Sequence, residues 1–209
     1  ESKVCEELLK KTVDASSDVC SLAIKCLAPL LSKCSEENGR KLVKKLCDNQ
    51  EEDPNQQSNK GKAGGSKSTN TGKVSKDAKF RSIALKTLIS DTKQGESGPS
   101  KVLVEETVPR MVAILQNVDQ KGEEALGESL EILHELLKKF SFFPWDKQVE
   151  LTESLLCLFT ASNTRNAFVK KKTILCLSSI AVYLETDLLE KVLKTCIGAL
   201  TSAGNPSSP

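Results

Sequence analysis

The feature that most constrains this chain is a five-position pattern of apolar and small residues that recurs along it at regular intervals. Its first copy consists of Val19, Leu22, Ala23, Cys26 and Leu27. The spacing of three and four residues is that of one face of an α-helix. Further copies begin at Phe80, Ala125 and Val169, so that successive copies start 61, 45 and 44 residues apart. The chain is therefore predicted to repeat one helical unit.

Within the pattern, the third position is always small and the fifth is always leucine. The third position holds Ala23, Ala84, Ser129 and Thr173. A small residue there lets neighbouring helices approach closely, and the leucine fills the space between layers. A period of about 40–47 residues with two helices per unit is typical of HEAT or armadillo repeats. We therefore predict an all-α HEAT-repeat α-solenoid, a right-handed superhelix of antiparallel helix pairs.

Helical periodicity extends beyond these four copies and divides the chain into elements. Nine helices are predicted, over residues 4–13, 19–31, 36–47, 76–91, 101–117, 123–140, 146–161, 167–184 and 187–201. Residues 1–202 would form about four repeats. Residues 48–75, rich in lysine, glycine and serine, offer too little apolar surface to offset the entropy of ordering and are predicted to be a flexible insertion. Residues 203–209 are predicted to be a disordered tail.

Charge and cysteine content narrow the class of protein. Thirty Lys and Arg against 28 Asp and Glu leave a net charge of +2, too balanced to favour nucleic acid or a membrane surface as partner. No apolar run approaches the roughly 20 residues that span a bilayer. The eight cysteines lie at helical spacing among aliphatic residues, which favours buried thiols over disulfides or a zinc site. A reducing location, cytoplasmic and nuclear, is expected.

Catalytic motifs are poorly supported. His134 is the only histidine, and its helix lacks the second histidine of a metalloprotease motif. The segment 65–73 ends in Gly-Lys, but its glycine spacing is wrong for a phosphate-binding loop and no strand precedes it. We expect no enzyme activity, no cofactor, no metal and no small-molecule substrate.

Basic side chains on the second helix of each repeat are the candidate contacts to a protein partner. The run 165–172 is rich in arginine and lysine, and it could be an electropositive contact, part of a nuclear-import signal, or simply the solvated start of a helix. Lys172 occupies the same pattern position as Leu22 and Ile83, so its methylene stem is expected to pack while its amine reaches water. The predicted protein-binding residues are Arg81, Arg165, Lys170 and Lys171.

Three segments resemble a known family. Asp18–Lys33 (DVCSLAIKCLAPLLSK) resembles an early second helix of the cullin-associated and neddylation-dissociated proteins, and Arg81–Ile89 (RSIALKTLI) is similar to the helix of the next repeat. Val169–Ile174 (VKKKTI) resembles a later element of the same family. Order and spacing agree over most of the chain, outside the insertion and the tail.

The resemblance implies a binding role. Family members are HEAT-repeat regulators that wrap an unmodified cullin with its RING subunit, hide the lysine that receives the ubiquitin-like modifier, and let substrate receptors exchange. The chain is similar to the repeats that hold the cullin and RING end, not to the part that displaces the adaptor. The alternative is an importin-like or TBP-interacting adaptor for transport or transcription, built on the same solenoid.

Overall fold

Nine α-helices make up the regular structure of the part of the chain that the computed structural model describes, residues 2–14, 16–48, 76–95, 97–117, 122–140, 145–160 and 167–203. They are α1 (Ser2–Lys11), α2 (Ser17–Lys33), α3 (Glu36–Asp48), α4 (Lys76–Asp91), α5 (Pro99–Gln116), α6 (Glu123–Lys139), α7 (Trp145–Thr160), α8 (Ala167–Ala181) and α9 (Thr186–Ala203). The predicted helices agree with these within a few residues. The largest difference is at α8, which ends at Ala181, three residues before the predicted end.

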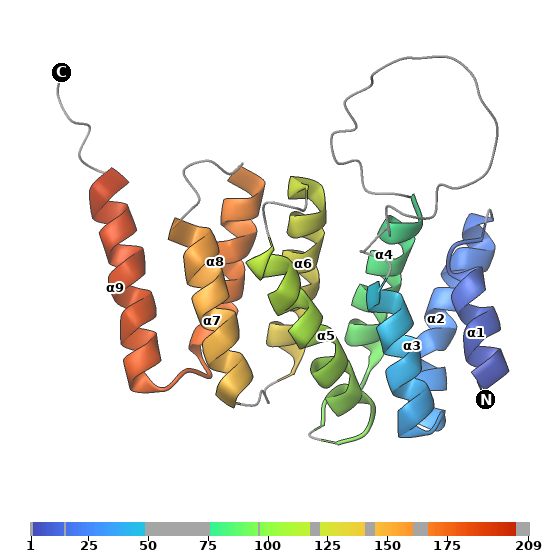
Figure 1. Cartoon of the computed structure of the whole chain (residues 1–209). Helices are drawn as coiled ribbons and strands as arrows, with labels where there is room; N and C mark the ends of the chain where they lie inside the picture. The colour runs from blue at the N-terminus through green and yellow to red at the C-terminus, as the bar shows by residue number, and fades with distance from the viewer. Residues whose placement is uncertain are drawn as a thin grey trace, which may run out of the picture.

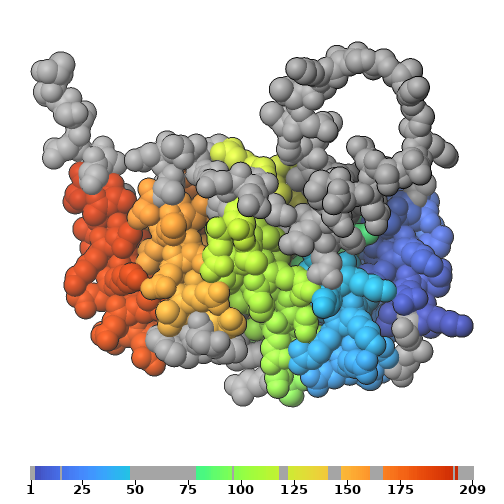
Figure 2. All heavy atoms as spheres, in the orientation of Figure 1, coloured from blue at the N-terminus to red at the C-terminus, as the bar shows by residue number. Residues whose placement is uncertain are grey.

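The helices stack in two layers. Helices α1, α3, α5, α7 and α9 form one layer, called here the odd layer, in which each helix packs on the next odd-numbered one. Helices α2, α4, α6 and α8 form the even layer in the same way, and the two layers pack together within each consecutive pair. The two ends of the chain lie at opposite ends of the stack (Figure 1), and successive pairs form successive bands along the molecule (Figure 2). The predicted all-α HEAT-type solenoid is confirmed.

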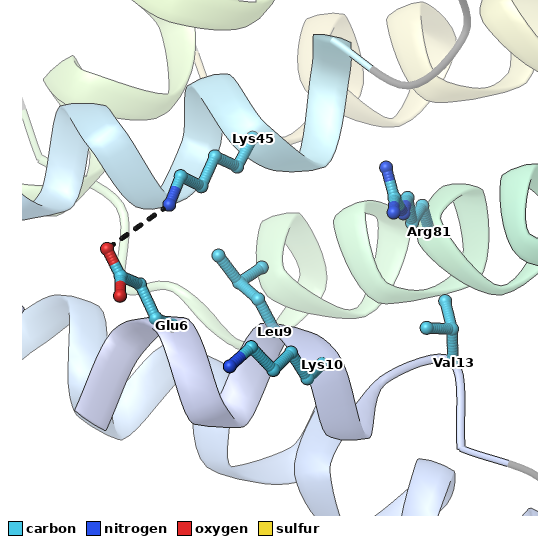
Figure 3. Close-up of a pocket in the computed structure, with 6 residues that line it drawn as sticks. All are labelled: Glu6, Leu9, Lys10, Val13, Lys45 and Arg81. Carbon is cyan, nitrogen blue, oxygen red and sulfur yellow. Dashed lines mark hydrogen bonds and ion pairs between the residues drawn. The ribbon is translucent and has the colours of Figure 1, made fainter. Parts of the chain in front are cut away.

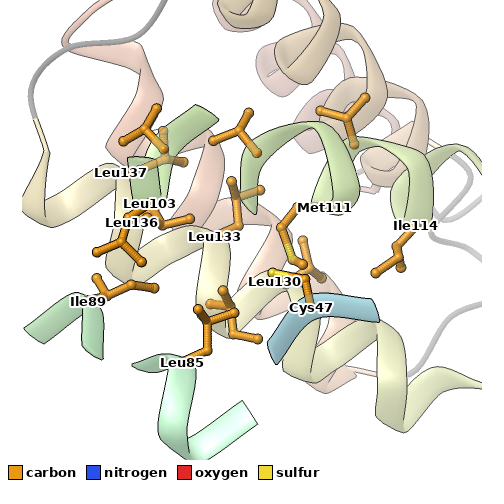
Figure 4. Close-up of a cluster of buried hydrophobic side chains, with 14 of the residues drawn as sticks. Cys47, Leu85, Ile89, Leu103, Met111, Ile114, Leu130, Leu133, Leu136 and Leu137 are labelled. Atoms are coloured by element: carbon orange, nitrogen blue, oxygen red, sulfur yellow. The ribbon is translucent and has the colours of Figure 1, made fainter. Parts of the chain in front are cut away.

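One apolar core runs through the stack from Cys5 on α1 to Val192 on α9. Its central part brings together side chains of α3, α4, α5 and α6 (Figure 4). The four leucines at the fifth pattern position are all buried, and so are the four small residues at the third: Leu27, Leu88, Leu133, Leu177, Ala23, Ala84, Ser129 and Thr173. The packing role predicted for both positions is therefore confirmed. No helix pair could cover its apolar face alone, and stacking makes the core continuous.

The face predicted to be buried on α2 is partly wrong. Val19 and Leu22 are exposed, as is Cys26, whereas Cys20 and Ile24 are buried. The helix has apolar residues over more than half of its circumference, and its neighbours α1 and α4 cover only part of that surface. The face in contact is thus fixed in part by α4, some 60 residues away in the sequence, which local periodicity does not report.

Half of the cysteines fulfil the prediction of buried thiols. Cys5, Cys20, Cys47 and Cys176 are buried, whereas Cys26 and Cys157 are exposed and the other two are intermediate. The Cys176 thiol donates to the Leu130 carbonyl oxygen at 3.2 Å, and burial raises its pKa to about 12. No grouping of His, Cys, Asp and Glu suited to a metal ion occurs among the described residues.

The two segments predicted to lack structure lie outside the described residues, except at their edges. Asp48 ends α3, and Ala203 ends α9. Within the described ranges, no helix is both long and apolar enough to cross a membrane.

Candidate protein-binding surface

The outer side of the even layer is the surface on which the predicted contact residues can be judged. The second pattern position lies on this side in all four repeats and holds Leu22, Ile83, Glu128 and Lys172. Because neighbouring even-numbered helices pack side by side, these four side chains form one row across the stack. The row changes character along its length, from aliphatic on α2 and α4 to charged on α6 and α8.

The aliphatic part of the row is well exposed. Leu22 has 68% of its surface accessible and Ile83 has 47%, and Val19 lies one helical turn before Leu22. Single exposed aliphatic residues are ordinary, but large ones at equivalent positions of adjacent helices form a patch, and patches mark interaction sites. We call Val19, Leu22 and Ile83 the apolar strip.

The charged part of the row is held by ion pairs around Glu131. The Glu131 carboxylate lies 2.7 Å from Lys172 Nζ on α8 and 2.9 Å from Lys86 Nζ on α4. The hydrogen bond from Lys172, together with that from Lys86, lowers the pKa of Glu131 although partial burial opposes the shift. The prediction that the Lys172 amine reaches water is therefore incomplete. The amine forms an ion pair with Glu131 that joins α8 to α6.

Glu128, one turn before Glu131 on α6, has the opposite electrostatic environment. Partial burial raises its pKa, and the positive charge of Lys86 only partly offsets this effect. The carboxylate stands where the first two repeats have leucine and isoleucine. It is desolvated there without a close ion pair among the described residues, so its charged form is disfavoured.

At Gly127, a side chain of α8 packs directly against the backbone of α6. A Cβ atom at this position would lie 2.4 Å from Cε1 of Phe168, far inside contact distance. The Phe168 ring therefore lies over the bare backbone of α6, and Lys172 Nζ lies 5.3 Å from the ring centroid, within the range of a cation–π interaction. Phe168 is still 48% exposed, so it is an aromatic feature of the same surface.

A shallow polar groove of about 440 Å³ crosses α4, α6 and α8 beside these ion pairs. The described residues that line it are Lys86, Thr87, Ser90, Asp91, Glu131, His134, Glu135 and Lys172. Ser179 Oγ lies 3.0 Å from His134 Nδ1 nearby. His134 lies inside α6 and Ser179 in the last turn of α8, and at both places the backbone amides are engaged in helical hydrogen bonds and supply no donors for an oxyanion. The pair therefore serves as a tie between α6 and α8.

The predicted contact residues are not gathered at one place. Lys170 and Lys171 lie near the start of α8, half-buried and exposed respectively, and form no ion pair with the described part of the chain. Arg81 is half-buried and lines a cleft between α4, α1 and α3, rather than the outer side of the even layer. Arg165 lies outside the described residues.

The ion pairs of α6 were missed in the sequence, although a signal for them exists. Lys79 and Glu124 are 45 residues apart and pair at 2.7 Å, and Lys86 and Glu131 are also 45 residues apart. This interval equals the repeat period. Opposite charges separated by one period occupy equivalent positions on neighbouring helices, so a search at that interval would have found both pairs.

Stacked pairs of antiparallel helices in two layers, with one continuous core, define an α-solenoid of the HEAT type, a class that binds proteins over extended surfaces. No protein-family model matches the sequence.

Similar proteins are nevertheless found among curated ones. Cullin-associated NEDD8-dissociated protein 1 of Arabidopsis thaliana is 29% identical over 191 residues, which are 91% of this chain and 14% of the relative. The Drosophila melanogaster protein of that name is 27% identical over 209 residues, and cullin-associated NEDD8-dissociated protein 2 of Mus musculus is 26% identical over 212. Each alignment with these two covers 100% of this chain and 15% of the relative. The resemblance predicted from three short segments is thus confirmed over nearly the whole chain, which spans only 14–15% of these relatives' length.

Proposed function

We propose that this chain is a non-enzymatic HEAT-repeat scaffold that binds cullin–RING complexes lacking the NEDD8 modification. In this role it would regulate the assembly of cullin–RING ubiquitin ligases and the exchange of their substrate receptors. The observation that carries the proposal is the similarity, over 91–100% of the chain, to proteins named for cullin association and NEDD8 dissociation. A reducing location in cytoplasm and nucleus belongs to the same proposal.

The outer side of the even layer is the surface proposed to meet the partner. It combines the exposed apolar strip with two cations near the start of α8, the half-buried Lys170 and the exposed Lys171. Binding energy in protein interfaces concentrates in a few apolar or arginine-rich contacts surrounded by weaker ones. We therefore assign the larger share of affinity to Leu22 and Ile83, and a smaller, salt-sensitive share to Lys170 and Lys171.

The test is a pull-down with the purified chain and a purified cullin–RING complex, prepared with and without NEDD8. Retention of the unmodified complex alone is the expected result. Equal retention of both forms would contradict regulation through the modifier, and retention of neither would refute the proposal for this chain. In the last case, binding to a small GTPase or to a basic cargo would favour the importin-like alternative.

Two pairs of matched variants locate the contact. Leu22→Glu with Ile83→Glu should weaken retention roughly tenfold, since a buried hot-spot side chain contributes at least 1–2 kcal/mol. The control is Val182→Glu with Ile197→Glu, which places the same two charges on exposed aliphatic positions at the far end of the stack. Equal weakening by both variants would refute the assignment to the apolar strip.

Charge reversal separates the electrostatic contribution. Lys170→Glu with Lys171→Glu should slow association and reduce its dependence on salt, because exposed charges act mainly on the on-rate. Lys3→Glu with Lys44→Glu makes the same change in net charge on the odd layer. An equal effect of both pairs would indicate nonspecific attraction and would contradict a role for α8.

A further inference from the structure

Two ion pairs join α4 to α6 on the outer side of the even layer. Lys79 Nζ lies 2.7 Å from the Glu124 carboxylate, and Lys86 Nζ lies 2.9 Å from the Glu131 carboxylate. The two lysines are seven residues apart on α4, and so are the two glutamates on α6. Residues at this interval lie two turns apart on one face of a helix. The two pairs therefore fix which residues of α4 and α6 lie opposite each other.

Between these two pairs, an aliphatic residue stands opposite a carboxylate. Ile83 follows Lys79 by one turn on α4, and Glu128 holds the equivalent place on α6. Partial burial raises the pKa of Glu128, and the positive charges of Lys86 and Lys79 oppose this shift, so the carboxylate lies close to α4. Glu128 is half-buried, and Ile83 is well exposed. The middle position therefore lacks the cation that both flanking positions have.

The Glu128 carboxylate is free to take a ligand. Within the described ranges, no side chain forms an ion pair or a hydrogen bond with it, and the two lysines of α4 that act on it are already paired with other glutamates. The cleft between α4, α1 and α3 differs in this respect, because its lining carboxylate, Glu6, lies 3.4 Å from Lys45 Nζ (Figure 3). Partial burial of a charge without a partner is unfavourable, so Glu128 would gain from a cation supplied by another molecule.

We propose that Glu128 and Ile83 form a binding site for an arginine side chain of a partner protein. The guanidinium would pair with the Glu128 carboxylate, and the aliphatic stem of the arginine would cover Ile83. Arginine suits this site better than lysine, because a guanidinium is more weakly hydrated than an ammonium group and offers paired N–H donors that match a carboxylate.

The arginine site continues the apolar strip. Leu22, Ile83 and Glu128 hold equivalent positions on α2, α4 and α6, so a partner lying along this row would meet two aliphatic side chains and then a carboxylate. A partner segment with apolar residues beside an arginine fits that order. The inference rests on the proposed function in taking the outer side of the even layer as the contact surface, and it adds the chemistry that the partner presents there.

The test is a fluorescence-anisotropy titration of the whole chain with a short labelled peptide of leucine and arginine. The same peptide with citrulline, an uncharged analogue of arginine, is the reference and should bind roughly fivefold more weakly, because it cannot form a charged pair. Glu128→Gln should weaken binding of the arginine peptide by about the same factor and remove its advantage over the citrulline peptide.

The matched control is Glu135→Gln. Glu135 is another half-buried glutamate of α6, two turns after Glu128, and its equivalent on α4 is the polar Ser90. Its replacement makes the same change in net charge and should leave binding of the arginine peptide unchanged. The place of binding is read from the methyl NMR signals of Ile83, which should shift when the arginine peptide is added.

Four results would overturn the proposal: no saturable binding of the arginine peptide, equal binding of the citrulline peptide, equal weakening by the two glutamate variants, or unshifted Ile83 methyl signals. A lysine peptide that binds as tightly as the arginine peptide would overturn the assignment to a guanidinium. The titration uses no cullin, so the arginine site and cullin binding can fail separately. Any of these results together with retention of the cullin–RING complex in the pull-down would refute the arginine site alone.

Discussion

Replacing Gly127 by alanine tests whether the close approach of α6 and α8 depends on the missing side chain. The new Cβ would lie 2.4 Å from one atom of the Phe168 ring and 3.0 Å from a second. The backbone of α6 is fixed by its own hydrogen bonds, so the ring must move. Phe168 is half-exposed and can swing toward solvent, which breaks its contact with α6 and with Lys172.

Two effects of opposite sign decide the outcome. Alanine in a helix interior is about 0.8–1 kcal/mol more favourable than glycine. Losing the buried half of the phenylalanine, about 80 Å² of apolar surface, removes roughly 2 kcal/mol, and the cation–π interaction adds about 0.5 kcal/mol. Gly127→Ala should therefore lower the free energy of unfolding by about 1.5 kcal/mol. In a Phe168→Ala background the clash is absent, and the same change should raise it by about 0.8–1 kcal/mol.

The assay is urea unfolding followed by circular dichroism for the four members of this double-mutant cycle. Gly198→Ala is the matched control, because a Cβ at Gly198 in α9 meets no atom within 4 Å. It should stabilise the chain by about 0.8–1 kcal/mol with or without Phe168. If Gly127→Ala stabilised the chain equally in both backgrounds, the steric argument would be refuted.

Three further predictions concern the charged and thiol groups. Glu131→Gln should lower stability at pH 7 by about 1 kcal/mol, and the difference from wild type should shrink as pH falls below 4.5, because the lowered folded-state pKa confers stability only above the unfolded value. Glu128→Gln should raise stability at pH 7, and this gain should fade as pH falls through the raised folded-state pKa of Glu128 toward 4.5. Urea unfolding midpoints measured from pH 3 to 8 check both glutamate variants. If the two variants changed stability in the same direction, the opposite environments assigned to Glu131 and Glu128 would be contradicted. Iodoacetamide at pH 8 should label exposed Cys26 and Cys157 but not Cys176, whose pKa burial raises to about 12. Mass spectrometry identifies the labelled cysteines. Labelling of Cys176 at the rate of Cys26 would contradict its burial.

The order and bounds of the helices could be predicted because the same five-position pattern occurs in each repeat. The alternation of a small residue and a leucine, as at Ala84 and Leu88, reports the packing of one helix on its equivalents. Both residues are fully buried. Because the pattern occurs four times, a departure from it in one helix, such as Glu128 in α6, does not hide it.

The orientation of individual helices could not be predicted as well. Leu22 and Ile24 are both aliphatic and only two residues apart, yet one is exposed and the other buried. The choice depends on where α1 and α4 pack on α2, which is a property of the assembled stack. In the same way, nothing local indicates that the Arg81 side chain lines a cleft between α4, α1 and α3.

The charges of the even layer have a consequence for the order in which repeats assemble. Apolar contacts between repeats use nearly the same residues in every copy, so on their own they would allow repeats to pair out of sequence. Helix α6 has five glutamates against two lysines, α8 has three lysines and no acid, and α4 has four basic residues against two acidic ones. Like charges would meet if α4 stacked directly on α8. The alternation of positive and negative helices along the even layer thus disfavours folding intermediates in which repeats pair in the wrong order. This electrostatic penalty should weaken in concentrated salt.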